Sequence, residues 1–260
     1  MAHGRSRDSL DRVHSAQRPM PHSRMIGDWD PLAGTPWSAP DTVAGFARSH
    51  PNHVLMRYAA DELDRHPAGR ALDVGCGAGR NAGPLAEQGW NIVGTDLSWP
   101  MLTAAADRAS HLSGPGQLDL LLAPMDRVPL QDSTFDLVIA HGIWNLARSA
   151  AEFRRAVGEA ARVAKSGALL FVFTFSRNTF AADVAPVAGE PFVFTQFSNQ
   201  PQCFLTDSQL VAELGAAGFV LDPRVPITEY NRPATGTRHG GAPVIYEALF
   251  RRAARTASGD

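Results

Sequence analysis

The stretch that decides the fold reads Ala71-Leu72-Asp73-Val74-Gly75-Cys76-Gly77-Ala78-Gly79. Its first part continues the apolar segment Arg70–Val74, which predicts a strand, and Arg80–Gln88 behind it has the composition of a helix that ends at Gly89. Glycine has no side chain, so the backbone of this turn can approach a ligand closely. The free N–H groups at the start of the helix point to the same place. The stretch therefore predicts a strand, a ligand-binding turn and a helix.

Strand and helix patterns alternate outward from this turn. We expect helices at Asp41–His66, Trp99–Ala109, Ala150–Ala164 and Asp207–Ala217. We expect further strands at Asn91–Thr95, Leu118–Ala123, Phe135–Ala140, Ala168–Phe175, Phe219–Ile227 and Val244–Arg251. Such alternation is typical of a mainly parallel sheet covered by helices on both faces. With Arg70–Val74 the expected sheet has seven strands.

Composition limits the domain organisation and the class of protein. The 260 residues fit one α/β domain over 41–252, with an aromatic-rich insertion at 176–205 and a short tail at 253–260. Residues 1–40 predict a largely flexible leader, in which two tryptophans either pack on the domain or form part of a lid. The net charge of −2 disfavours a nucleic-acid binder. Two cysteines, no signal peptide and no membrane-length apolar run indicate a cytoplasmic protein without membrane contact.

The spacing of the glycines separates two kinds of cofactor. A dinucleotide turn has the pattern Gly-x-Gly-x-x-Gly, whereas this turn reads Gly-x-Gly-x-Gly and has Arg80 where that pattern requires the last glycine. Asp73 also stands two positions before the first glycine. Its carboxylate would repel a pyrophosphate and attract the α-ammonium group of a methionyl moiety. A nicotinamide or flavin oxidoreductase is therefore the less favoured alternative.

The string Asp73–Gly79 resembles motif I of class I S-adenosylmethionine-dependent methyltransferases, and the resemblance extends over residues 70–175. It implies a Rossmann-like sheet with S-adenosylmethionine as cofactor and S-adenosylhomocysteine as product. It implies that the turn binds this cofactor. The motif I residues expected to contact it are Asp73, Gly75, Cys76, Gly77 and Gly79.

A second acidic residue, Asp96, ends the strand Asn91–Thr95 and is followed by Leu97 and Ser98. By resemblance, Asp96 holds the ribose hydroxyls through charge-assisted hydrogen bonds, and Leu97 lies beside the cofactor. Asp96 also suits a nicotinamide site or the N-terminal cap of the next helix, so it does not identify the cofactor alone.

The adenine end departs from the family pattern. The family places an aspartate after the third strand, but Pro124 stands at that position and Asp126 comes two residues later. We expect the backbone N–H of Met125 to meet the adenine ring. Asp126 either reaches the adenine amino group or is a solvated loop acid.

The residues after the fourth strand are expected to face the transferred methyl group. His141 is the candidate general base and cofactor contact because histidine titrates near neutral pH; its alternative role is a hydrogen bond to a neighbouring loop. Trp144 forms either a wall of the substrate pocket or part of the core. Phe180 and Phe197 of the insertion, with Tyr230, are the other candidates for the substrate site.

These residues predict methyl transfer to a small-molecule acceptor through a thiol or chalcogen, a hydroxyl or an amine. No cluster of metal ligands is apparent in the sequence, so no metal site is expected. Two alternatives stay open: a catalytically silent protein that binds the cofactor, and a methyltransferase that acts on a protein or RNA partner through residues 1–40.

Overall fold

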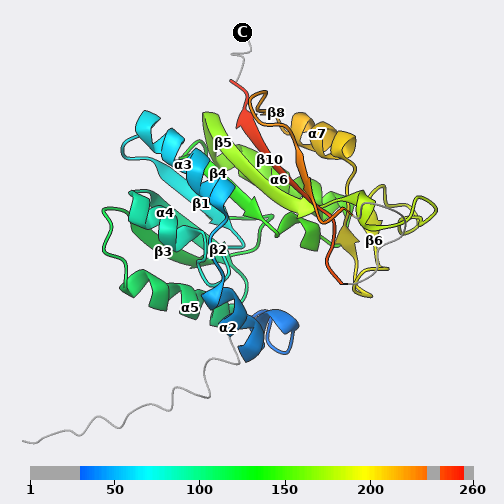
Figure 1. Cartoon of the computed structure of the whole chain (residues 1–260), viewed down its shortest axis with the longest axis horizontal. Coiled ribbons are helices and arrows are strands. Elements are labelled where there is room, and N and C mark those ends of the chain that lie inside the picture. The colour runs from blue at the N-terminus through cyan, green and yellow to red at the C-terminus, as the bar shows by residue number, and fades with distance from the viewer. Residues whose placement is uncertain (1–29, 233–240, 255–260) are drawn as a thin grey trace, which may run out of the picture.

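The main sheet has eight strands and is mostly parallel (Figure 1). The computed structural model describes residues 30–232 and 241–254. The strand order is β3-β2-β1-β4-β5-β10-β8, and β9 pairs with β10. Strands β1 to β5 run parallel, whereas β10 is antiparallel to its three neighbours. The strands are β1 (Arg70–Val74), β2 (Asn91–Asp96), β3 (Gln117–Leu122), β4 (Phe135–His141), β5 (Ala164–Phe175), β8 (Phe219–Leu221), β9 (Thr228–Tyr230) and β10 (Ile245–Arg252).

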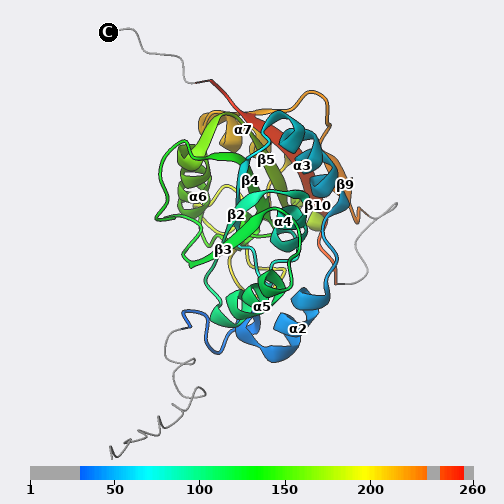
Figure 2. The same cartoon turned by 90° about the vertical axis from the view of Figure 1, so that its left-hand side faces the viewer.

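Helices cover both faces of this sheet (Figure 2). The helices are α2 (Pro40–Arg48), α3 (His53–Arg65), α4 (Ala82–Gln88), α5 (Trp99–Ser110), α6 (Ala150–Val163) and α7 (Asp207–Ala216). One apolar core forms where α6 and α7 meet the sheet, and a second where α3 and α4 meet it. The expected α/β architecture, mainly parallel and covered on both faces, is confirmed.

The predicted helix over Asp41–His66 is two helices. Helix α2 ends at Arg48 and α3 begins at His53. Pro51 disfavours helical backbone at the residue before it. The side chain of Asn52 then accepts hydrogen bonds from the N–H groups of Val54 and Leu55, which starts a new helix. The break places Asn52 beside the glycine-rich turn, where its own N–H donates to Asn81 at 3.0 Å.

The predicted strand over Phe219–Ile227 is also divided. Strand β8 ends at Leu221 and β9 begins at Thr228. Between them the N–H of Val225 donates to the carbonyl of Asp222 in a turn, and the prolines at positions 223 and 226 have no N–H to donate to a strand neighbour. This division gives the sheet eight strands in place of the expected seven.

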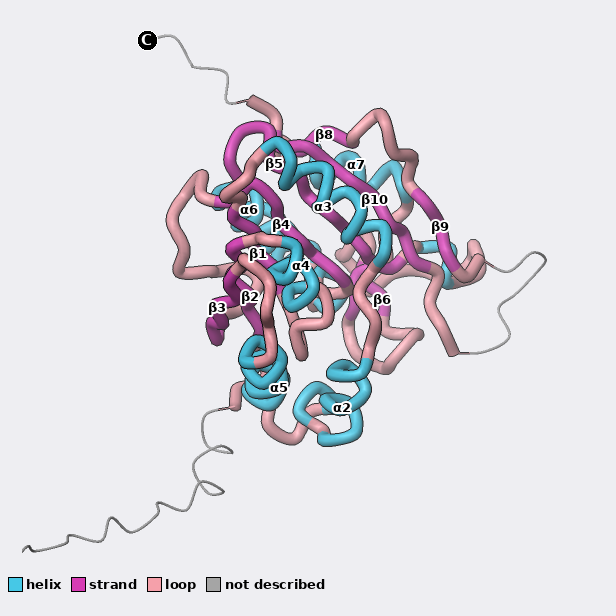
Figure 3. The backbone as a smooth tube through the Cα atoms, turned by 60° about the vertical axis from the view of Figure 1, so that its left-hand side comes forward, coloured by secondary structure: helices cyan, strands magenta, loops and turns pink. Residues whose placement is uncertain are grey.

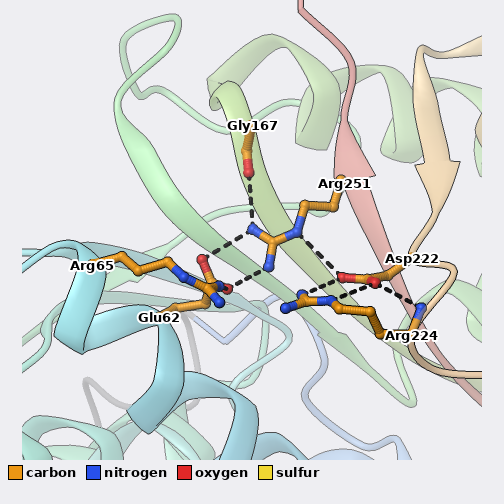
Figure 4. A network of polar contacts seen from close by, with 6 residues as sticks. All are labelled: Glu62, Arg65, Gly167, Asp222, Arg224 and Arg251. Atoms are coloured by element: carbon orange, nitrogen blue, oxygen red, sulfur yellow. Dashed lines mark hydrogen bonds and ion pairs between the residues drawn. The ribbon is translucent and has the colours of Figure 1, made fainter.

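A network of ion pairs joins α3 to the last strands (Figure 4). Glu62 of α3 and Asp222 after β8 are each 2% exposed, and both bind the guanidinium of Arg251 on β10. Arg65 and Arg224 complete the network. Burial would raise the pKa of Glu62, but its contacts with Arg251 and Arg65 lower it overall. The hydrogen bonds from Arg224 hold the pKa of Asp222 well below its usual range.

The insertion at 176–205 forms a small aromatic core of its own. It contains the two-stranded sheet of β6 (Val193–Phe194) and β7 (Gln202–Cys203). In the tube view its strand β6 lies beyond the end of β5 (Figure 3). Phe204 is fully buried and contacts the rings of Phe180 and Phe194 at centroid distances of 4.7 and 5.9 Å. The loop is therefore packed through its aromatic side chains.

Within the described ranges no helix is long and apolar enough to cross a membrane.

Candidate active site

The three glycines after β1 all have left-handed backbone. Their φ angles are 69° at Gly75, 53° at Gly77 and 71° at Gly79, a conformation that side chains disfavour. A Cβ on Gly75 would lie 2.6 Å from Ile143, so that glycine is also required by packing. A Cβ on Gly77 would meet nothing closer than Phe46 at 3.7 Å. The turn therefore leaves Gly77 as its open backbone position.

Asp96 is joined to this turn by a direct hydrogen bond. The N–H of Gly77 donates to Oδ2 of Asp96 at 2.9 Å, and the N–H of Ser98 donates to Oδ1 at 2.8 Å. Parallel pairing of β1 and β2 brings both strand ends to the same edge of the sheet. Burial raises the pKa of Asp96 in spite of these hydrogen bonds. Each carboxylate oxygen of Asp96 keeps a lone pair that can accept a hydrogen bond from a hydroxyl group of a ligand diol.

Asp73 carries a buried oxygen without a partner. The residue is 1% exposed, and its Oδ2 makes no hydrogen bond with any part of the chain that the structure describes. Burial raises its pKa to about 7, and the Asp96 charge adds to this, although the Arg80 charge opposes it. A buried carboxylate oxygen normally has a donor. A ligand that brings a cationic donor to this position would meet that need.

Arg80 is the site residue whose role the sequence did not suggest. It follows Gly79, and its Nη2 lies 2.7 Å from Nδ1 of His141 at the end of β4. Burial lowers the pKa of Arg80, whereas the charge of Asp73 raises it. Arg80 is thus a cation between an acid and an imidazole. The one signal in the sequence was its position directly after the third glycine.

His141 lies inside a stack of aromatic rings. Its ring centroid is 4.2 Å from that of Phe173 and 6.0 Å from that of Phe171, with nearly parallel planes. Burial and the neighbouring Arg80 charge lower the pKa of His141 to about 3. The imidazole is therefore neutral at physiological pH. An imidazole of this pKa is a poor proton acceptor, and its environment works against a role as general base.

Trp144 belongs to the core. It is 1% exposed in a short 3-10 turn, η2 (Trp144–Leu146), and meets the ring of Phe153 edge-on at 6.0 Å. Of the two roles considered for this tryptophan, the structure favours the packing role.

The adenine candidates lie after β3, and one of them is already engaged. Arg155 of α6 donates its Nε to Oδ2 of Asp126 at 3.0 Å. This ion pair competes with an adenine amino group for the carboxylate. Met125 packs, partly buried, against the core beneath α6.

The three remaining candidates lie toward the β5–β10 side of the site. Phe180 stacks on Phe194 at 5.1 Å, inside the aromatic core of the insertion. Phe197 meets Phe175, the last residue of β5, at 5.5 Å. Tyr230 of β9 donates its hydroxyl to Glu247 at 2.8 Å, and its ring lies 6.4 Å from Phe173. The structure therefore places Tyr230 next to the ring that stacks on His141.

A segment before α2 covers the start of α5. Oδ1 of Asp30 accepts a hydrogen bond from the N–H of Trp99, and Oγ of Ser98 donates to the carbonyl of Trp37. Trp37 meets Phe46 edge-on at 6.1 Å, and Phe46 faces Gly77. The segment before α2, together with Phe46 of α2, therefore extends from the residues that follow Asp96 to the glycine turn. Most of the leader, including Trp29, lies outside the described residues.

Comparison with known proteins places this chain in a family. A family model described as "Methyltransferase domain" matches residues 72–172. A demethylmenaquinone methyltransferase of Corynebacterium glutamicum is 31% identical over 66% of this chain and 71% of its own length. One from Renibacterium salmoninarum is 32% identical over 48% of each chain. The chain thus spans about half of the second relative.

Solved structures agree with the fold. The 1,6-didemethyltoxoflavin-N1-methyltransferase of Burkholderia thailandensis, solved with S-adenosylhomocysteine, has a TM-score of 0.56 and 18% identity over 78% of this chain and 80% of its own. At that identity the likeness shows the fold alone. Together with the motif I turn and the 31% identical relative, it leads to one conclusion. This chain belongs to the class I S-adenosylmethionine-dependent methyltransferases.

Proposed function

We propose that this protein transfers the methyl group of S-adenosylmethionine to a small-molecule acceptor. The observation that carries the proposal is the unpaired, buried Oδ2 of Asp73 beside an open glycine turn. The α-ammonium group of the cofactor is a cationic donor that fits this oxygen. In the free chain, by contrast, the carboxyl has a raised pKa and no hydrogen-bond partner for Oδ2 among the described residues.

Arg80 supplies the matching charge for the other half of the methionyl group. The Asp73 carboxyl raises the pKa of Arg80, so the two side chains interact through opposite charges. A methionyl moiety carries an α-ammonium and an α-carboxylate on one carbon. Asp73 would bind the first and Arg80 the second, which requires the Arg80 guanidinium to share its donors between His141 and the carboxylate.

The remaining cofactor contacts follow from the two strand ends. Asp96 would accept hydrogen bonds from the ribose hydroxyls while it keeps the N–H of Gly77 in place. Gly75, Cys76 and Gly79 shape the backbone around Gly77, and Leu97 lies beside Asp96. Met125 would meet the adenine ring. Asp126 would do so only if Arg155 released it.

The bound cofactor supplies an electrophilic methyl group on a sulfonium. The chain aligns the acceptor and excludes water. His141 is held neutral between Arg80 and Phe173, which suits it to orient an acceptor through a hydrogen bond. Phe197 and Tyr230 supply apolar surface on the same side, and Phe180 supports the insertion from within its aromatic core. This arrangement favours a partly apolar acceptor.

Two further features support a small-molecule acceptor. The net charge of −2 gives no general attraction for nucleic acid. The relatives from Corynebacterium and Renibacterium are named demethylmenaquinone methyltransferases, so a quinol is the first acceptor class to assay.

The test is calorimetric titration of the purified chain with S-adenosylmethionine, S-adenosylhomocysteine and NAD, followed by an assay of S-adenosylhomocysteine release with a panel of quinols, phenols, thiols and amines. We expect micromolar binding of the two sulfur ligands, none of NAD, and turnover with at least one acceptor. Binding without turnover across the panel would favour a silent cofactor-binding protein. No binding of either sulfur ligand would overturn the proposal.

A further inference from the structure

A cavity lies away from the glycine turn, between α3 and the strands β9 and β10. Its volume is about 200 Å³. Val54 and Tyr58 of α3 line one side, and Ala248 and Leu249 of β10 line the other, with Val225 from the turn after β8. Leu249 pairs with Phe171 in the middle of β5, and Glu247 pairs with Phe173, so the cavity extends along β10 from the level of His141 into the body of the sheet.

The floor of this cavity carries a buried acid without a counter-charge. Glu247 is 5% exposed and lines the cavity. Its carboxylate accepts hydrogen bonds from two neutral donors, the hydroxyl of Tyr230 at 2.8 Å and the amide of Asn52 at 2.6 Å. Among the described residues, no lysine, arginine or histidine forms an ion pair with it. Buried carboxylates are normally paired with a cation.

The rim of the cavity has the opposite charge. Arg57 lines the cavity and is exposed to solvent, with its guanidinium 4.7 Å from the centre of the Tyr58 ring. Arg224 directs Nε and Nη2 to Asp222, at the far end of the ion-pair network (Figure 4). Its Nη1 makes no hydrogen bond to a described residue and remains a donor. The cavity thus has an acid at its floor, apolar walls, and two guanidinium groups at its mouth.

We propose that this cavity binds a small zwitterion of the ω-amino acid class. The ammonium group would pair with Glu247, the methylene chain would lie against Val54 and Leu249, and the carboxylate would meet Arg57 and Arg224 at the mouth. An α-amino acid carries both charges on one carbon and cannot reach both ends. Strand residues rise ~3.3 Å each. A ligand that binds Glu247 and passes the apolar surface of Leu249, two residues further along β10, therefore needs several methylene groups between its two charges.

A short series of residue contacts links this cavity to the cofactor site. Asn52 binds Glu247 through its side chain, and its backbone N–H donates to Asn81 just before α4. Tyr230 binds Glu247 and lies beside Phe173. The cavity shares Tyr230 with the proposed acceptor side, but its charged residues are distinct from the glycine turn, so ligand binding here can be tested separately from cofactor binding.

The experiment is calorimetric titration of the full chain with γ-aminobutyrate, δ-aminovalerate and ε-aminocaproate. Hexylamine and hexanoate serve as probes that carry only one of the two charges. We expect one of the ω-amino acids to bind about tenfold or more tightly than either single-charge probe. No binding of any ω-amino acid, or equal binding of hexylamine, would overturn the proposal.

Variants locate the site. Glu247→Gln and Arg224→Gln should each weaken ω-amino acid binding about tenfold or more. Arg154→Gln, which removes an exposed arginine paired with Glu213 on the opposite face, should leave it unchanged. S-adenosylhomocysteine binding in the same samples shows that each variant is folded and tests the methyltransferase proposal separately. Unchanged ω-amino acid affinity in a folded Glu247→Gln variant would contradict the assignment.

Discussion

Nη2 of Arg80 lies 2.7 Å from Nδ1 of His141, and this contact joins the glycine turn after β1 to the end of β4. A guanidinium can only donate, so the imidazole nitrogen that it meets accepts and is not protonated. The contact therefore fixes the charge of the candidate catalytic histidine. It also brings a cation next to the place where a cationic cofactor would bind.

His141 should stay neutral across the physiological range. Burial and Arg80 hold its pKa at about 3, so its ring resonances should not titrate between about pH 5 and pH 8. Replacing Arg80 by Gln removes the charge and should raise the pKa, while burial keeps it below its usual value. An NMR titration checks this, with His141→Asn to assign the signals. A wild-type His141 that titrates near ~6.5 would contradict the structure.

Binding of S-adenosylmethionine should release a proton from Asp73. With a pKa of about 7, this carboxyl is about half protonated at neutral pH in the free chain. The α-ammonium group of the cofactor stabilises the carboxylate and lowers that pKa, so about half a proton is released. Calorimetry in buffers of different ionisation enthalpy measures the release. Asp73→Asn should abolish it, and equal release by both proteins would remove Asp73 from the ammonium site.

The same carboxyl makes stability depend on pH. Its folded pKa of about 7 lies above the ordinary value of 3.8. The folded chain therefore binds more protons than the unfolded chain between these values, and this contribution to stability is lost as the pH rises. Asp73→Asn should gain stability relative to the wild type from about pH 4 to about pH 7. Thermal melts along this range test the sign, and a constant difference would contradict it.

Asp96→Ala should weaken cofactor binding by ~1.5–3 kcal/mol, or roughly ten- to a hundredfold, because charge-assisted hydrogen bonds to the ribose are lost. Asp132→Ala is the matched control, since that aspartate is 65% exposed and pairs with Arg162 on the surface. Calorimetry with S-adenosylhomocysteine gives both affinities. An Asp96→Ala protein that is folded and binds as tightly as the control would remove the ribose assignment.

The sequence predicted the parts of this site that depend on local pattern. Alternating glycines after an apolar strand specify the turn, and an acid at the end of the next strand lies at the same edge of a parallel sheet. The strand and helix patterns likewise indicated the layers of the fold. These features need only short-range regularity and the general geometry of α/β sheets.

The sequence did not predict the features that depend on distant contacts. Arg80 and His141 are 61 positions apart, and their hydrogen bond exists because β1 and β4 are neighbours in the sheet. The low pKa of His141 arises from its burial, to which rings on β5 contribute, and from the charge of Arg80. Pro51 lies inside the predicted helix Asp41–His66, and the second helix begins behind it where the side chain of Asn52 accepts hydrogen bonds from the N–H groups of Val54 and Leu55.

Arg251→Ala should destabilise the fold by ~1–3 kcal/mol, because two buried carboxylates lose hydrogen bonds from a shared guanidinium, although Glu62 keeps Arg65 and Asp222 keeps Arg224. Glu62 and Asp222 both bind this guanidinium (Figure 4). Arg154→Ala, which breaks the exposed pair with Glu213, should cost ~0–1 kcal/mol. Urea unfolding of the two variants measures the difference. Equal losses would mean that the buried network contributes no more than a surface pair.

Gly77→Ala should separate backbone strain from close approach to the cofactor. Its φ is 53°, and that of Gly167 is 79°, so an alanine at either position costs ~1–2 kcal/mol. A Cβ at Gly167 would meet nothing within 4 Å, and at Gly77 it would meet only Phe46 at 3.7 Å and Met101 at 3.9 Å. Neither alanine clashes with the chain, so the two variants should lose similar stability in thermal melts.

Their affinities for S-adenosylhomocysteine should nevertheless differ, because only Gly77 lies where the turn must approach the cofactor. Gly167 stands at the opposite end of β5, where its carbonyl accepts a hydrogen bond from Arg251. Gly77→Ala should reduce the affinity about tenfold or more, and Gly167→Ala should leave it near the wild-type value. If Gly77→Ala bound as well as Gly167→Ala, the open backbone of the turn would not be the point of contact, and the cofactor would have to be placed elsewhere along the edge of the sheet.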